Sequence, residues 1–358
     1  MEDLELINFY KNKRVFVTGH TGFKGSWLCQ ILLGMGAEVY GYALEPEENG
    51  LFQLCKLKDS VYSTIADIRD ESALQTAFQK AHPDVVFHLA AQPLVQKGFR
   101  NPALTYDTNV MGTVHLLDCV RGSDCVGSVV NVTTDKVYRN EEWVWGYRET
   151  DALGGHDPYS SSKSCSELVT HCYQASFFSQ SNVGISTMRA GNVIGGGDFA
   201  QNRIVPDCIR AALAGQPVLL RNPSATRPYQ HVMEPLAAYL MVAQRQYRNP
   251  SVAGSYNVGP RDEDCISNLE LVQMFCESWG ESMGWEISPN AEFFPEARLL
   301  RLDCSKIDAA FAWKPCWNVR QAVQKTVEWA KGCRDGKEAA RLIEQQIAEY
   351  RAGGDFGA

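Results

Sequence analysis

The residues Arg14-Val15-Phe16-Val17-Thr18-Gly19-His20-Thr21-Gly22-Phe23-Lys24-Gly25 decide the fold of this chain. The first five form an apolar run typical of a buried strand, and residues 26–33 have helical character. Between them lies a G-x-x-G-x-x-G spacing, which permits a tight turn, a close backbone approach to a ligand and close helix packing. This order predicts a dinucleotide site with its pyrophosphate at the helix N-terminus. An ordinary glycine-rich turn is the weaker alternative, because the turn directly follows a buried strand.

Strand and helix signals continue to alternate through the first half of the chain. Strands are expected at residues 38–43, 61–65, 85–91 and 126–132, and helices at about 70–81 and 103–121. The pattern predicts an α/β fold, a doubly wound parallel sheet of the Rossmann type with its ligand at the carboxyl ends of the strands. We expect a dinucleotide-binding domain at residues 1–190, which carries the catalytic residues, and a smaller α/β domain at 191–358, which mainly binds the substrate and has segments returning to the sheet. From residue 189 onward we expect a strand at 189–194, a helix that opens at Asn202 and helices from about 318 to 350.

Composition narrows the class of protein. The chain has 358 residues, of which 45% are hydrophobic, and a formal net charge of −8, which argues against general binding to nucleic acid or anionic membranes. The N-terminal segment is acidic and no apolar stretch is long enough to span a membrane, so we expect a cytoplasmic protein. The 12 cysteines form no Cys-x-x-Cys pair and the 7 histidines no zinc-like spacing, which predicts reduced thiols and no metal.

Polar residues with proton-transfer chemistry follow the strand expected at 126–132. Thr134, Asp135 and Lys136 come directly after it, and Tyr159 and Lys163 form a Tyr-x-x-x-Lys pair on one helix face. We expect the lysine ammonium to favour the tyrosine phenolate, whose ordinary pKa is ~10. The pair alone occurs by chance in many helices. The neighbouring hydroxyl, carboxylate and amine exceed what alcohol oxidation needs and suit an elimination.

Together these segments resemble the extended short-chain dehydrogenase/reductases, which modify nucleotide sugars. The likeness covers nearly the whole chain and rests on Gly19 to Gly25, Asp67-Ile68, His88-Leu89-Ala90-Ala91, Asn109-Val110-x-Gly112-Thr113 and Tyr159-x-x-x-Lys163. Further segments resemble the CDP-glucose 4,6-dehydratases within that family, at residues 91–95, 134–138, 143–149, 153–159, 191–198 and 221–228. Lys136 stands where dTDP- and GDP-sugar dehydratases usually carry glutamate, which favours the CDP branch.

The resemblance implies NAD as the cofactor. The acidic residue that often binds the adenosine ribose is missing, because the second strand ends Tyr42-Ala43-Leu44, but no arginine there suggests a 2′-phosphate pocket. Asp67 is either a cofactor contact or the cap of a helix beginning near Asp70. The expected cofactor contacts are Gly19, Gly22, Phe23, Lys24, Gly25, Asp67, Ile68, Ala90, Ala91, Asn109, Tyr159 and Lys163.

The resemblance also implies a reaction, which yields CDP-4-keto-6-deoxy-glucose for deoxysugar and O-antigen or lipopolysaccharide biosynthesis. Tyr159 removes the proton of the sugar 4-hydroxyl while hydride leaves C4, and hydride later returns to C6. Asp135 is the expected acid for the departing 6-hydroxyl, and Thr134 aligns the 4-oxygen. Lys136 is either a C5 base whose pKa burial has lowered or a cation that stabilises the enolate.

The expected substrate contacts include arginines, whose guanidinium groups form paired hydrogen bonds with phosphate. An isolated arginine is more often a surface residue. Gly98 departs from the family, which often has a serine near this position that touches the sugar. The expected substrate residues are Gln92, Thr134, Asn192, Arg203, Arg227 and Arg301.

The resemblance further implies a homodimer or homotetramer, formed through helices near 103–121 and 159–178. Val169, Cys172 and Tyr173 line one face of the second helix or belong to the internal core. The alternatives in function are a 4,6-dehydratase for another nucleotide sugar, an epimerase, and an NAD-binding sensor without turnover. Asp135 and Lys136 argue against the epimerase, which needs neither an acid for water loss nor a base at C5.

Overall fold

A seven-stranded parallel sheet forms the centre of the protein in the computed structural model, which describes residues 2–280, 283–287 and 297–353. The strands are β1 (Arg14–Thr18), β2 (Glu38–Ala43), β3 (Tyr62–Ile65), β4 (Val85–His88), β5 (Ser128–Val132), β6 (Gly184–Ala190) and β11 (Ser255–Val258). Their order across the sheet is β11-β6-β5-β4-β1-β2-β3, and every neighbouring pair is parallel. The predicted doubly wound sheet is confirmed.

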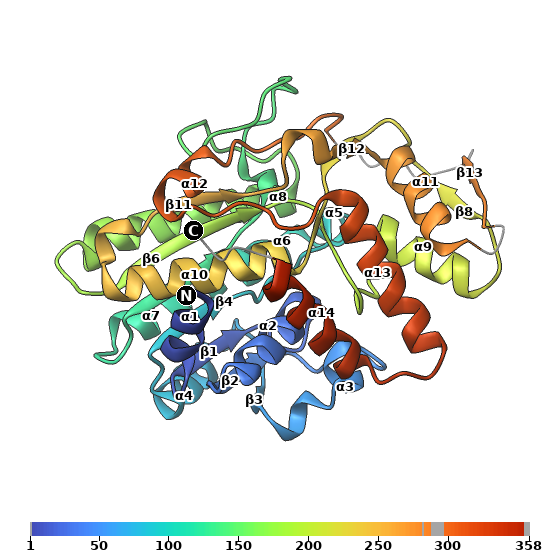
Figure 1. Ribbon diagram of the computed structural model, residues 1–358. Helices are drawn as coiled ribbons and strands as arrows, with labels where there is room; N and C mark the ends of the chain where they lie inside the picture. The colour runs from blue at the N-terminus through green and yellow to red at the C-terminus, as the bar shows by residue number, and fades with distance from the viewer. Residues whose placement is uncertain (1, 281–282, 288–296, 354–358) are drawn as a thin grey trace.

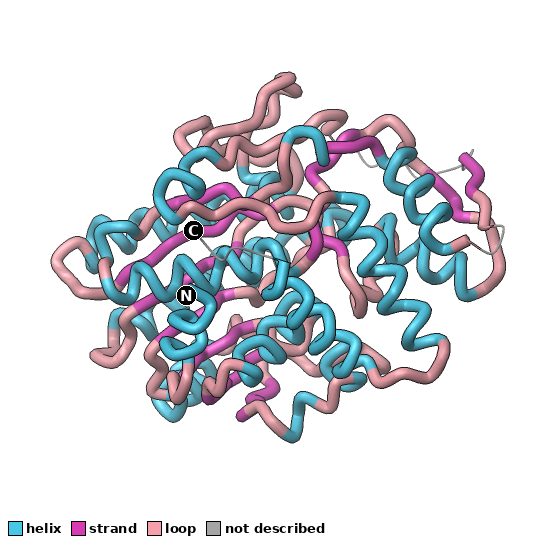
Figure 2. The backbone as a smooth tube through the Cα atoms, in the orientation of Figure 1, coloured by secondary structure: helices cyan, strands magenta, loops and turns pink. Residues whose placement is uncertain are grey.

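Helices cover both faces of the sheet (Figures 1 and 2). Val15 and Val17 of β1 point to one face, where the larger hydrophobic cluster includes α1 (Glu2–Tyr10), α2 (Phe23–Gly34) and α10 (Met233–Arg248). Phe16, between them, points to the other face, because side chains alternate along a strand. The helices on that face are α4 (Glu71–Ala81), α7 (Gly112–Arg121) and α8 (Pro158–Tyr173).

Several predicted elements differ from the observed ones in their bounds. The strand expected at 189–194 is two strands, because the chain leaves the sheet after β6 and β7 (Val193–Ile194) pairs instead with β10 (Gln230–His231). The helix expected at 103–121 begins as α6 (Pro102–Tyr106) and passes through a π-helical turn, η2 (Asp107–Met111), before α7. Helix periodicity in the sequence does not reveal such a turn, which inserts one residue into the helical repeat.

Some of the segments after β6 form small two-stranded sheets beside the large one. β8 (Val218–Leu220) pairs with β13 (Trp285–Ile287), and β9 (Thr226–Pro228) pairs with β12 (Cys265–Ser267). Two helices, α9 (Ile204–Leu213) and α11 (Asn268–Trp279), lie with β8 and β13 at the right of Figure 1. The other helices after β6 are η5 (Pro250–Val252), η6 (Asp262–Asp264), α12 (Ser305–Phe311), α13 (Val319–Arg334) and α14 (Ala339–Gly353), of which η5 contacts β6 and α12 contacts β11 of the large sheet.

The end of the described chain returns to the first half of the molecule. α14 contacts α2 and α3 (Leu51–Leu54), as Figure 1 shows, while β11 completes the edge of the large sheet. No helix in the described part of the chain is long and apolar enough to cross a membrane. The short helices not yet named are η1 (Leu57–Asp59), α5 (Val95–Arg100), η3 (Asp135–Val137) and η4 (Gln174–Phe178).

Candidate active site

The glycine turn between β1 and α2 passes very close to the neighbouring backbone. Gly19 has φ +75°, and a Cβ there would lie 2.8 Å from the backbone nitrogen of Ala90, after β4. A Cβ at Gly25 would lie 2.1 Å from the carbonyl oxygen of Gly19. α2 begins after Gly22 without a side-chain cap, so its first N–H groups have no side-chain acceptor from the cap residue. This cradle suits the pyrophosphate of a dinucleotide.

The residues after β3, Asp67 and Ile68, make contacts with other residues of the protein. The Asp67 carboxylate pairs with Arg69 at 2.7 Å, and the hydrogen bonds from Arg69 hold the pKa of Asp67 below its usual value. Asp70 caps α4 by accepting a hydrogen bond from the Ala73 N–H at 2.9 Å, so the alternative that Asp67 is the cap is wrong. Ile68 is buried and packs against Gly112, where a Cβ would lie 2.9 Å from its Cγ2. Cofactor contacts by Asp67 and Ile68 stay predictions.

A buried amide pair fixes the loop after β4. The Asn109 side chain, in the π turn, accepts from the Gln92 N–H at 2.7 Å and donates to Ser162 Oγ of α8 at 2.8 Å. The Gln92 side chain bonds Leu94 and Thr105. Both residues therefore hold the loop beside α8, and the expected ligand contacts of Asn109 and Gln92 stay predictions.

Local sequence places Tyr159 in the first turn of α8. Asp157 caps the helix by accepting from the Ser160 N–H, and Pro158 occupies the first helical position, which its fixed φ suits. Lys163 lies one turn later, where its Nζ donates to the Val132 carbonyl at 3.0 Å. A Cβ at Gly98 would lie 3.2 Å from the Tyr159 nitrogen, so this departure from the family lies directly beside Tyr159.

Burial dominates the protonation of these groups. It raises the pKa of Tyr159 to about 12, although a hydrogen bond with Thr134 and the positive charge of Arg203 lower it. It lowers the pKa of Lys163 to about 8, and that of Lys24 to about 7, where the charges of Arg203 and Lys163 add to the effect. Burial thus opposes the lowering of the tyrosine pKa that we expect from Lys163, and that effect of Lys163 stays a prediction.

Asp135 has the most unusual environment in the site. Its side chain is fully buried, and Oδ1 accepts from Thr134 Oγ1 at 3.0 Å and from Lys136 Nζ at 2.9 Å. Lys136 Nζ also donates to Asn192 Oδ1 at 3.2 Å. The other carboxylate oxygen, Oδ2, is buried and has no partner in the described part of the chain. A Cβ at Gly191 would lie 3.1 Å from it, so a glycine leaves room there.

The three predicted substrate arginines take different positions. Arg203 pairs with Asp198 at 3.2 Å, and its charge reaches Tyr159 and Lys24. Arg227 lies buried on β9, opposite Ile266 of β12. Arg301 has a buried Nε without a hydrogen-bond partner in the described residues, and its charge acts on Cys265 of the same strand. The charge of Arg203 thus acts on the predicted reacting groups, while Arg227 pairs with β12 and the charge of Arg301 acts on it.

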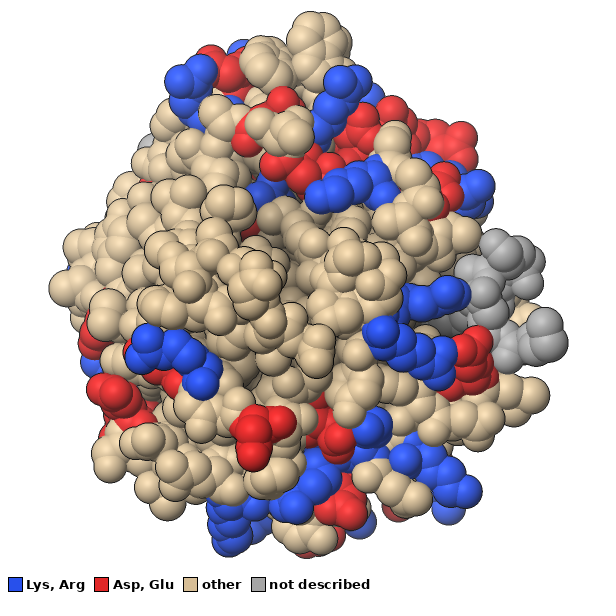
Figure 3. Space-filling model, turned by 90° about the vertical axis from the view of Figure 1, so that its left-hand side faces the viewer, with Lys and Arg blue, Asp and Glu red and all other residues tan. Residues whose placement is uncertain are grey.

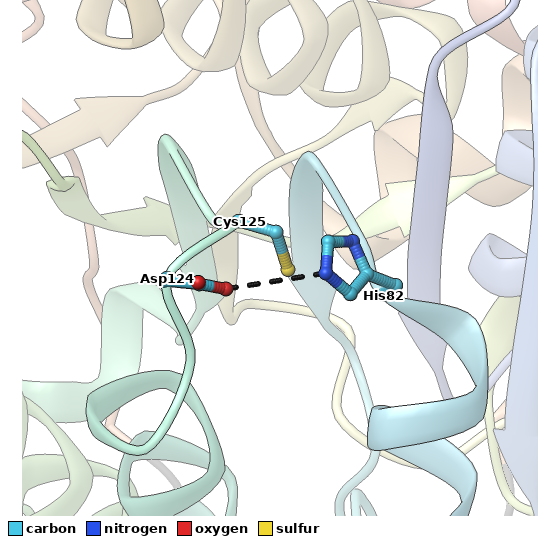
Figure 4. A group of neighbouring side chains, drawn as sticks. All are labelled: His82, Asp124 and Cys125. Atoms are coloured by element: carbon cyan, nitrogen blue, oxygen red, sulfur yellow. Dashed lines mark ion pairs between the residues drawn. The ribbon is translucent and has the colours of Figure 1, made fainter.

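One group of side chains away from this site has the ligand types of a metal centre. His82, Asp124 and Cys125 offer ligand atoms within 4.8 Å of one another (Figure 4). His82 and Asp124 are exposed, and the three residues precede β4 and β5. They therefore lie at the amino ends of the strands, whereas Thr134 and Asp135 lie at the carboxyl ends. The absence of a metal stays a prediction.

Sequence reasoning missed a buried acidic residue behind the site. Glu167 is 2% exposed, and its carboxylate contacts Thr133, directly before the Thr134–Lys136 segment. The available signal was spacing, because Tyr159, Lys163 and Glu167 follow one another at four-residue intervals on α8.

Comparisons with known proteins agree with this architecture. Residues 16–326 match the family described as GDP-mannose 4,6 dehydratase. The chain is 46% identical to a CDP-glucose 4,6-dehydratase of Salmonella typhimurium over 96% of this chain and 97% of that protein, and 26% identical to a dTDP-glucose 4,6-dehydratase of the same organism over 88% and 92%. Among solved structures it is similar in fold to a Bacillus anthracis dTDP-glucose 4,6-dehydratase in complex with NAD, with a TM-score of 0.75, 22% identity and coverage of 91% and 99%. A Thermus thermophilus UDP-glucose 4-epimerase complex with NAD gives a TM-score of 0.77, with 24% identity and coverage of 89% and 99%.

Proposed function

Because the chain belongs to the GDP-mannose 4,6-dehydratase family, we propose that it is an NAD-dependent lyase that converts CDP-glucose into CDP-4-keto-6-deoxy-glucose. The choice of CDP-glucose is supported by the Salmonella relative of that name and by Lys136. The glycine cradle at Gly19 and Gly25 supports NAD as the cofactor. When bound, NAD accepts a hydride from C4 of the sugar and later returns it to C6.

The observation that carries the proposal is the buried Asp135 beside Thr134 and Tyr159. Tyr159 takes the proton of the 4-hydroxyl, and Thr134, which hydrogen-bonds Tyr159, keeps the two oxygens aligned. Asp135 Oδ2, which has no partner in the described residues, gives a proton to the departing 6-hydroxyl. Groups for the oxidation, from α8 and the segment after β5, thus lie beside an acid for water loss, which is what a dehydratase requires and an epimerase does not.

Lys136 has contacts that favour one of its two possible roles. Its Nζ donates to Asp135 Oδ1 at 2.9 Å and to Asn192 Oδ1 at 3.2 Å. Two oxygen acceptors bind an ammonium group well, because it has three donors and no acceptor. Lys136 therefore acts as the cation that stabilises the enolate formed when C5 gives its hydrogen as a proton to solvent water, and Asn192 holds the ammonium group in place.

A competition among nucleotide sugars tests the proposal. The purified protein is incubated with NAD and CDP-glucose, dTDP-glucose, UDP-glucose or GDP-mannose, and the 4-keto product is followed by its alkaline absorbance and by the loss of one water in mass. Turnover restricted to CDP-glucose is expected. Preference for another sugar nucleotide would identify a dehydratase of that sugar, and a 4-epimer without water loss would identify an epimerase.

We also propose a homodimer or homotetramer. Apolar side chains are exposed on the helices predicted to form the interface, namely Tyr106, Met111, Leu168 and Phe177. Val169 and Tyr173 instead pack partly against the core beneath, while Cys172 is exposed. The side on which α7 lies in Figure 1 faces the viewer in Figure 3, where the central area has few charged side chains. Light scattering of wild type and Leu168→Asp tests this, and an unchanged mass would argue against the interface. The cytoplasmic location and the role in O-antigen biosynthesis stay predictions.

A further inference from the structure

α8 holds the carboxyl end of β5 at two consecutive residues. Lys163 Nζ donates to the carbonyl oxygen of Val132 at 3.0 Å, and the Thr133 hydroxyl donates to Glu167 Oε1 in a short hydrogen bond. The next residues along the chain are Thr134, Asp135 and Lys136, which the proposed function places in the reaction. Two contacts from one rigid helix therefore fix the point from which this segment extends.

The Glu167 carboxylate is itself held from three sides. Oε2 accepts from Thr187 Oγ1 at 2.7 Å, from Arg189 Nη2 at 2.9 Å and from Ser255 Oγ at 3.4 Å. Arg189, 3% exposed, supplies the opposite charge that a buried carboxylate needs. A purely structural ion pair between α8 and β6 would account for these contacts of Oε2. It does not require the contact with Thr133, which lies on a different segment.

We propose that Glu167 is a positioning residue, which holds Thr133 so that Thr134 and Asp135 meet Tyr159, and which keeps the Lys163 side chain charged. The inference rests on the proposed function for what those residues do, but the contacts themselves do not depend on it. Glu167 lies one helical turn beyond Lys163, so its negative charge favours the ammonium form. In agreement, burial lowers the pKa of Lys163 to about 8 and the charge of Glu167 opposes that change.

Other charged and titratable groups face this pair and stay unchanged in the test. Lys24 on α2 and His88 on β4 lie near Lys163, and burial chiefly lowers the pKa of each, with the charge of Lys163 contributing. Tyr138 and Arg189 face Glu167, where burial raises the pKa of Tyr138. Burial lowers the pKa of Arg189, but Glu167 and Tyr138 outweigh it and raise the pKa. Because all of these groups remain in the variant, they contribute to both pH profiles, and the Thr133 variants described below separate the charge of Glu167 from its contact with Thr133.

The test compares Glu167→Gln with Glu234→Gln in the full chain. Glu234 is also fully buried and accepts hydrogen bonds from Cys316, Trp317 and Tyr350, but it contacts none of the reacting residues. Glu167→Gln is expected to lower kcat for CDP-glucose about 10- to 100-fold with KM within about twofold. The fall of kcat/KM at alkaline pH should move to lower pH by about half a unit or more, because Lys163 loses its proton more readily. Glu234→Gln should keep the wild-type pH profile.

Thr133 provides a second pair of variants in case Glu167→Gln leaves Arg189 uncompensated and does not fold. Thr133→Val removes the contact and retains the ion pair, so kcat is expected to fall, while Thr133→Ser keeps the hydroxyl and should restore it. Wild-type kcat in Thr133→Val, together with an unshifted pH profile in any folded Glu167 variant, would overturn the inference.

A crystal structure of Thr133→Val needs no substrate and separates this inference from the proposed function. Displacement of residues 134–136 from their wild-type positions is expected. An unchanged segment would overturn the positioning role even if the wild type turned over no nucleotide sugar. Conversely, inactive wild type with a displaced segment would count against the proposed function alone.

Discussion

Asp135→Asn separates the oxidation from the loss of water. Asparagine has nearly the same shape, and its Oδ1 can still accept from Thr134 Oγ1 and Lys136 Nζ, which lie 3.0 and 2.9 Å from Asp135 Oδ1. The substitution therefore keeps the geometry but removes the proton that Oδ2 gives to the 6-hydroxyl. Proton transfer by a positioned side chain contributes ~10²–10⁴-fold, which is about 3–5 kcal/mol at ~1.36 kcal/mol per tenfold.

The upper half of that range applies here, because the Asp135 side chain is 0% exposed and bulk water cannot replace it. The assay is a single turnover of CDP-glucose with NAD, followed at the absorbance of NADH and by mass. Reduced cofactor should accumulate while water loss stops, since Tyr159 and Thr134 are intact. Water loss within about threefold of wild type would refute the assignment of Asp135 as the acid.

Three further substitutions or conditions have defined outcomes. Lys136→Met should retain NAD binding and abolish exchange of the C5 hydrogen with solvent, as measured by NMR; exchange at the wild-type rate would remove Lys136 from the mechanism. Burial lowers the pKa of Lys163 to about 8, so this side chain is charged below pH 8 and neutral above it. The kcat/KM of the wild type should therefore fall about tenfold per pH unit above 8. Lys163→Arg stays charged, so its kcat/KM should stay constant to higher pH. By the same linkage, the unfolded chain holds this proton up to ~10.4, so Lys163 makes the free energy of unfolding rise with pH between about 8 and that value. Gly25→Ala should destabilise the fold by about 1–3 kcal/mol and weaken NAD binding measured by calorimetry, because its Cβ would lie 2.1 Å from the Gly19 oxygen. Gly34→Ala is the control, because its Cβ would meet nothing within 4 Å.

The fold was predictable because its signals are local. Apolar runs such as Val15-Phe16-Val17 predict strands wherever they occur, and the glycines at 19, 22 and 25 require a particular turn. The elements that differ depend on tertiary contacts. The strand predicted at 189–194 is interrupted between β6 and β7, because β7 pairs with β10, more than thirty residues later. No local sequence pattern predicts such a distant partner.

The site divides in the same way. Thr134, Asp135, Tyr159 and Lys163 could be named from their motifs, and the structure brings them together at the carboxyl end of β5. The rise of the Tyr159 pKa that burial causes could not be predicted from the motif, because it depends on how much water the fold excludes. The positioning role that we propose for Glu167 could not be predicted from a motif, because it arises from a contact with Thr133, 34 residues away in sequence.

The fate of the C4 hydrogen tests the central claim most directly. CDP-glucose carrying deuterium at C4 is converted in ordinary water by the protein with NAD, and the product is analysed by NMR and mass spectrometry. The account predicts 4-keto-6-deoxy product with the deuterium at C6 and a solvent hydrogen at C5. Deuterium retained at C4, with an inverted or unchanged centre and no loss of water, would contradict it.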